Sequence, residues 1–93
     1  MSEKIVTTVS AAQTAALFGA TDAHIRLLEE RFGVTVRNAG GSGADTGDAL
    51  IVTGEEPGLG RAVAALEYLK RMTASGDTLD EQSVEYVLGM VSD

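Results

Sequence analysis

A polar, glycine-rich stretch, NAGGSGADTGD at Asn38–Asp48, separates two short apolar runs, Val34–Val36 and Ala49–Thr53. It contains no apolar residue larger than alanine, and such a composition predicts a flexible loop. Parallel strands would need a longer crossover between them, usually a helix. The two runs are therefore predicted to pair as antiparallel strands, with Val34–Val36 beside Leu50–Val52.

The remaining patterns predict one more strand and four helices in a single domain spanning residues 1–93. β-Branched runs predict strands, and apolar residues spaced i, i+3 and i+7 predict helices. In chain order the predicted elements are a strand at Lys4–Val9, helices at Ala11–Phe18 and Ala23–Phe32, the two paired strands, a long helix from Pro57 to a stop at Ser75–Gly76, and a last helix ending near Val91. This β-α-α-β-β-α order, with residues 4–74 as core and 78–91 as an appended helix, predicts a two-layer α+β fold with a three-stranded antiparallel sheet.

Short motifs predict where the helices begin. Residues Ser10–Gln13 have the pattern S-x-x-Q and residues Thr78–Glu81 have the pattern T-x-x-E, and both are typical of a capping box. Thr21 or Asp22 is predicted to cap the helix that follows them. Pro57 fits at or near the first position of the long helix, where its missing N–H is tolerated.

Apolar stripes on the helices predict the core. Leu28 and Leu66 each lie in the middle of a stripe, so both are predicted to be buried. The predicted stripes are Ile25, Leu28 and Phe32; Leu59, Ala62, Val63, Leu66, Leu69 and Met72 or Thr73; and Val84, Val87, Leu88 and Val91. Tyr86 and Met90 add a second strip at i, i+4 on the last helix, which either packs on the domain itself or contacts a partner.

Charge and composition narrow the classes of partner. The net charge is −7, and residues 75–93 hold five acids and no base, so the first 74 residues carry only −2. This acidity disfavours strong nonspecific nucleic-acid binding but leaves room for a weak local site. The chain has no cysteine, no apolar run long enough to span a membrane and no secretory signal, so we expect a cytoplasmic protein without disulfides or membrane contact.

The sequence offers no recognisable catalytic or metal-binding constellation. The glycine-rich stretches lack the Gly-Lys-Ser/Thr ending of a phosphate loop. His24 is the only histidine, and it is interpreted as a surface residue because no second histidine or cysteine can complete a metal site. Adjacent helical residues point about 100° apart, so the pair Glu29–Glu30 is interpreted as a solvated face. We therefore predict that this chain is not an enzyme and holds no metal or cofactor.

Several ordered segments resemble a KH-type domain, in which a helix ends in a GxxG loop, a second helix follows, and two antiparallel strands flank a variable loop. The segments are LFG at 17–19, DAHIRLLEERFGVTV at 22–36, LIVTGEE at 50–56 and RAVAALEYL at 61–69. Together with GDTLDEQSV at 76–84, they are similar to the N-terminal domain of PhoH-like proteins, over about Val9 to Val91. In that family a P-loop ATPase domain follows this unit. This chain lacks it, and is either an excised domain or a stand-alone relative.

The resemblance implies a non-catalytic accessory domain that binds single-stranded RNA weakly or positions RNA or a partner for the ATPase domain. The alternative is a structural interaction or assembly module without nucleic-acid binding, and an oligomer is compatible with either. The implied RNA site is Gly19, Ala20, Thr21 and Asp22, with Arg26 and Arg37 as the nearest bases. The second apolar strip of the last helix, Tyr86 and Met90, is the predicted partner contact. Asp22 replaces the second glycine of the GxxG loop, and the loop carries no base.

Overall fold

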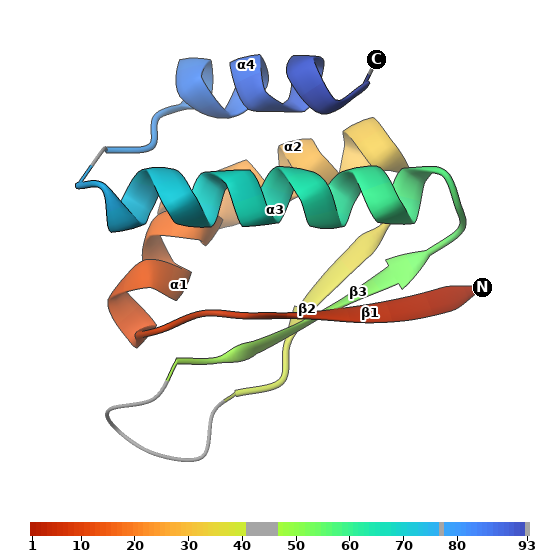
Figure 1. Ribbon diagram of the computed structural model, residues 1–93, viewed down its shortest axis with the longest axis horizontal. Helices are drawn as coiled ribbons and strands as arrows, with labels where there is room; N and C mark the ends of the chain where they lie inside the picture. The colour runs from red at the N-terminus through yellow and green to blue at the C-terminus, as the bar shows by residue number, and fades with distance from the viewer. Residues whose placement is uncertain (41–46, 77, 93) are drawn as a thin grey trace.

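The computed structural model describes residues 1–40, 47–76 and 78–92 (Figure 1). Its elements are strand β1 (Ser2–Thr7), helix α1 (Ala11–Phe18), a 3-10 turn η1 (Ala20–Asp22), helix α2 (Ala23–Phe32), strands β2 (Thr35–Asn38) and β3 (Ala49–Gly54), and helices α3 (Gly58–Ala74) and α4 (Glu81–Ser92). The predicted α+β class, the β-α-α-β-β-α order and the additional C-terminal helix are confirmed.

The three strands form one antiparallel sheet in the order β1-β3-β2. Val36 pairs with Val52, which confirms the predicted pairing across the glycine-rich stretch. Residues 41–46 of that stretch lie outside the described residues. The first strand was predicted at Lys4–Val9 but occupies Ser2–Thr7, because its regular pairing with β3 ends where Thr7 lies opposite Ala49. There the Thr8 hydroxyl accepts a hydrogen bond from the backbone N–H of Asp48 at 2.7 Å.

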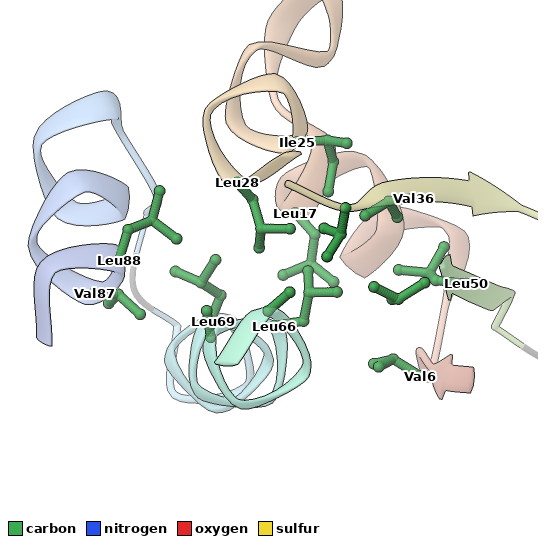
Figure 2. Packing of buried hydrophobic residues seen from close by; sticks show 14 of the residues in the cluster. Val6, Leu17, Ile25, Leu28, Val36, Leu50, Leu66, Leu69, Val87 and Leu88 are labelled. Atoms are coloured by element: carbon green, nitrogen blue, oxygen red, sulfur yellow. The ribbon is translucent and has the colours of Figure 1, made fainter. Parts of the chain in front are cut away.

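Helices cover one face of this sheet, and the core lies between the two layers (Figures 1 and 2). Side chains alternate along a strand, so Val36 and Val52 point toward the helices while Arg37 and Ile51 point to the uncovered face. Leu28 and Leu66 are 1% and 0% exposed, as their places in the stripes predict.

Helix α3 begins one residue after Pro57, close to the predicted start. Its fully buried residues include Ala65, which the predicted stripe missed, while Val63 and Met72 are only partly buried. Ala65 lies three residues after Ala62 and four before Leu69, so helical spacing places it on the same buried face. None of the helices is long and apolar enough to cross a membrane, in the part of the chain that the structure describes.

The beginning of α4 differs from the prediction. Asp80, rather than Thr78, caps the helix, and its carboxylate accepts a hydrogen bond from the backbone N–H of Ser83 at 2.7 Å. Leu79 packs against the core, which fixes the chain immediately before the cap. The helix then packs on α2 and α3 through Val84, Val87 and Leu88, as predicted.

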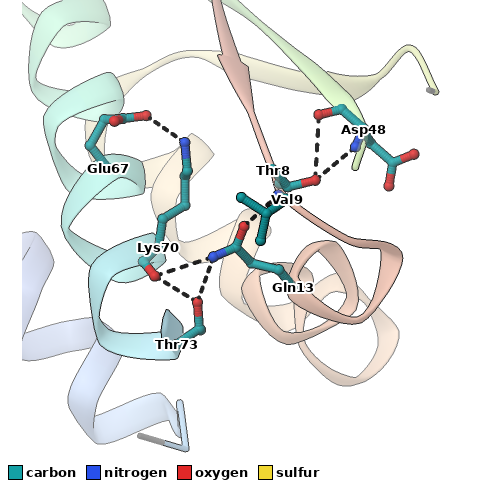
Figure 3. A network of polar contacts seen from close by, with 7 residues as sticks. All are labelled: Thr8, Val9, Gln13, Asp48, Glu67, Lys70 and Thr73. Carbon is teal, nitrogen blue, oxygen red and sulfur yellow. Dashed lines mark hydrogen bonds and ion pairs between the residues drawn. The ribbon is translucent and has the colours of Figure 1, made fainter. Parts of the chain in front are cut away.

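A polar network fixes α1 between the sheet and α3 (Figure 3). The Ser10 hydroxyl accepts the N–H of Gln13 at 3.1 Å, which confirms the predicted N-cap. The Gln13 amide oxygen in turn accepts the N–H of Val9 at 2.8 Å. The Gln13 amide nitrogen donates to the hydroxyl of Thr73 at 3.0 Å, so Gln13 also joins α1 to the end of α3.

Candidate functional site

The junction between α1 and α2 holds the predicted loop, and Gly19 has a structural role in it. Its φ is +77°, a region that glycine adopts far more readily than other residues. A Cβ atom at this position would lie 2.7 Å from the imidazole ring of His24. His24 is thus half-buried, with Nδ1 3.4 Å from the carbonyl oxygen of Ala16, rather than a surface residue as predicted.

The other residues of the loop are exposed and form a tight turn. Thr21 and Asp22 both adopt left-handed conformations, with φ values of 52° and 61°. Neither side chain caps α2, so the prediction that one of them would do so is wrong. The left-handed backbone replaces the extended conformation that an N-cap residue normally has. The first backbone N–H groups of α2 therefore lack a side-chain acceptor among the described residues.

The two candidate bases lie on different parts of the surface. Arg26 is exposed on α2, within the helical layer, one turn after Asp22. Arg37 is exposed on β2, where the alternation with Val36 directs its side chain to the uncovered face of the sheet. The structure therefore does not bring the two guanidinium groups to one face of the sheet, and their roles in RNA binding stay predictions.

An acidic side chain lies between α2 and the outer edge of β2. The carboxylate of Glu29 accepts a hydrogen bond from the backbone N–H of Val36 at 2.8 Å. The interpretation of Glu29–Glu30 as a solvated face is thus correct for Glu30, which is exposed, and wrong for Glu29, which is half-buried. Because Glu29 and Val36 belong to different elements, no helical pattern could have indicated this contact.

The predicted partner contact lies on an exposed apolar surface of α3 and α4. Tyr86 is 70% exposed and Met90 is 41% exposed. Tyr86 and Met72 of α3 line one cleft of about 310 Å³. Met72 and Tyr68 line a second cleft of about 260 Å³. The guanidinium of Arg71 lies 5.4 Å from the centre of the Tyr68 ring. We call Tyr68, Met72, Tyr86 and Met90 the α3–α4 surface.

A cavity of about 670 Å³ lies between α1 and the end of α3. Small residues form most of its wall, among them Ala12, Ala16 and Ala74, and His24 is the one titratable residue among the described residues that line it. Within the described residues, no buried side-chain nitrogen or oxygen lacks a hydrogen-bond partner. No group of three or more histidine, cysteine or acidic residues could hold a metal ion in that same part of the chain.

Comparison with protein-family models gives no match to this sequence, and comparison with curated proteins gives none either. The resemblance to PhoH-like proteins accordingly stands on the sequence motifs alone and stays a prediction.

Proposed function

We propose that this chain is a KH-like, non-catalytic accessory domain of a PhoH-type ATPase, and that it acts through protein contact. Its partner in this proposal is the ATPase domain, which would bind the α3–α4 surface. The element order and the motifs that resemble PhoH-like proteins support the proposed class. The exposed Tyr86 and Met90 carry the proposed mode of action.

The chemistry of the α3–α4 surface supports protein contact. Aromatic residues, methionine and arginine are enriched in protein interfaces, and this surface combines two tyrosines and two methionines with Arg71. Methionine adapts to irregular partner surfaces because its side chain is flexible and polarisable. The acid Asp80, which lines the same cleft as Tyr86 and Met72, favours a partner with a basic rim.

A titration of this domain with a separately expressed PhoH-type ATPase domain tests the proposal. We expect the Tyr86→Ser/Met90→Ser double variant to raise Kd about tenfold or more, as the loss of a central aromatic anchor does. Val9→Ser is the matched control, since Val9 is also an exposed apolar residue but lies between β1 and α1. Absence of binding by the unmodified domain, or equal loss in both variants, would contradict the proposed contact.

Weak binding of single-stranded RNA is a second candidate function. The N-terminus of α2 favours it, because no described side chain caps it and the positive end of a helix attracts an anion, and the exposed Arg26 lies one turn away. Asp22, the carboxylate of Glu29 and the net charge of −7 oppose it. Few usable bases imply few phosphate contacts and a shallow dependence on salt.

A titration with labelled RNA at low salt distinguishes the two candidates. We expect Asp22→Gly to strengthen RNA binding and Arg26→Ala/Arg37→Ala to abolish it if the loop is the site. Tight binding that neither change alters would place the site elsewhere. No binding by any variant would leave protein contact as the better function.

A further inference from the structure

The outer edge of β1 has backbone groups directed away from the sheet. The N–H of Thr8 donates to the carbonyl oxygen of Asp48 at 2.9 Å, so this residue faces β3. In an antiparallel ladder, residues alternate between facing the neighbouring strand and facing away. Glu3, Ile5 and Thr7 therefore direct their N–H and C=O groups to the outer edge. All three residues are exposed, and a strand edge of this kind is a template for a further strand.

The side chains of the same residues lie on the uncovered face of the sheet. Ile5 is 61% exposed and pairs with Ile51, which is half-buried on the same face. Arg37 follows Ile51 in the same row, on β2. A strand added beside β1 would thus extend both the backbone ladder and an apolar row that begins with these two isoleucines.

We propose that β1 pairs with β1 of a second copy of this chain, antiparallel and centred on Ile5, so that one continuous sheet spans both copies. This register places Ile5 opposite Ile5 of the partner copy and Glu3 opposite its Thr7. All three outward-facing residues of each strand then meet an outward-facing residue. Within the strand, a register centred on Lys4 would pair only Ile5 and Glu3 among the outward-facing residues. A register centred on Val6 would pair only Ile5 and Thr7.

Charge favours the same register and permits a second copy as the occupant. Centring on Lys4 would place two lysines directly opposite each other, and such like-charge pairs destabilise a sheet. Centring on Ile5 places Lys4 opposite Val6. The strand itself is neutral, since it carries one acid and one base, Glu3 and Lys4. The acids of α4 lie on the far side of the helical layer from the sheet (Figure 1), so they oppose self-association there only weakly.

A charge-exchange experiment at Ile5 tests this pairing by sedimentation equilibrium at low salt. We expect the unmodified chain to dimerise, and Ile5→Lys and Ile5→Glu each to raise the dimer Kd at least about tenfold, because each puts like charges across the two-fold axis. An equimolar mixture of the two variants should recover the dimer, since opposite charges then face each other. Circular dichroism of each variant checks that the fold is retained.

Three results would overturn the proposal. They are a monomeric unmodified chain up to about 1 mM, undiminished dimers of the single-charge variants, and failure of the mixture to recover a dimer. If the β1 edge instead receives a strand from a different protein, the unmodified chain alone will stay monomeric, which is the first of these results. The Tyr86→Ser/Met90→Ser variant should still dimerise, because its substitutions lie on α4. The dimer and the contact proposed for the α3–α4 surface can therefore fail independently.

Discussion

The two outer strands of the sheet present their edges differently. At β2, the outward N–H of Val36 is bound by Glu29 of α2, and this helix lies alongside the strand. At β1, the outward groups of Ile5 face away from the domain, and α3 packs on the face of that strand. An exposed edge invites pairing with another chain. The domain therefore satisfies one edge internally, whereas we assign the other edge to a second copy.

The largest effect expected from a single substitution lies in the core beneath the two edges. Leu28 comes from α2, which contacts β2, and Leu66 comes from α3, which contacts β1 and β3 (Figure 2). Both side chains are fully buried, so Leu28→Ala and Leu66→Ala should each lower the free energy of unfolding by about 2–5 kcal/mol in urea melts. Similar losses would show that the edges differ in hydrogen bonding and not in packing. A Leu28→Ala loss below about 1 kcal/mol would indicate that α2 is held mainly by its polar contacts.

The sequence predicts those features that depend on local spacing. Ser10 caps α1 as its motif indicates, and Leu28 and Leu66 are buried because helical periodicity determines which face each occupies. The second capping motif shows the limit of this reasoning. Residues 78–83 allow a cap at Thr78 or at Asp80, and the packing of Leu79 on the core accompanies the cap at Asp80. That packing depends on where α4 meets the other helices, which local sequence does not specify.

The candidate site was less predictable than the fold. The sequence correctly shows that Gly19 ends α1, but the close approach of the His24 ring to that glycine requires the turn geometry of residues 20–22. The hydrogen bond between Glu29 and Val36 joins a helix to a strand edge, so it depends on tertiary structure. Arg37 faces away from the helices because side chains alternate along β2 and the neighbouring Val36 faces the helices.

The turn that directs α2 toward the β2 edge should be the next most sensitive position. Gly19→Ala is expected to cost about 1–3 kcal/mol, because alanine is strained at this backbone conformation. Its Cβ would also press on the His24 ring. Adding His24→Ala should recover the steric part of the loss only, which a double-mutant cycle in urea measures. Ala20→Gly is the neighbouring control. A neutral Gly19→Ala would show that this glycine is not required structurally, and would favour a ligand-binding role for it.

Removing the carboxylate at the β2 edge tests the comparison directly. Glu29→Ala should destabilise the domain by about 1–3 kcal/mol, because the N–H of Val36 loses its acceptor. Glu29→Gln retains an acceptor and should cost less. Glu3→Ala, on the β1 edge, should change stability by less than about 0.5 kcal/mol. Amide exchange at Val36 should accelerate in Glu29→Ala and not in the other two variants. If Glu29→Ala and Glu3→Ala prove equal, the two edges do not differ in the way the structure indicates.

The smallest effect is expected at Asp80, where an exposed carboxylate caps a helix. The hydrogen bond from the backbone N–H of Ser83 lowers the pKa of Asp80 below its ordinary value. The ionised cap therefore stabilises α4 fully above the ordinary pKa, and this contribution is lost as the pH falls below about 4 and through the lowered pKa. Asp80→Asn keeps an acceptor that does not titrate, so amide exchange at Ser83 should become less dependent on pH in this range. Asp80→Ala should weaken protection at every pH. If the Asn variant keeps the full acid dependence of the unmodified chain, another group controls it. Unlike the carboxylate of Glu29, that of Asp80 accepts its hydrogen bond within its own helix, so these changes should leave the protection of Val36 unaltered.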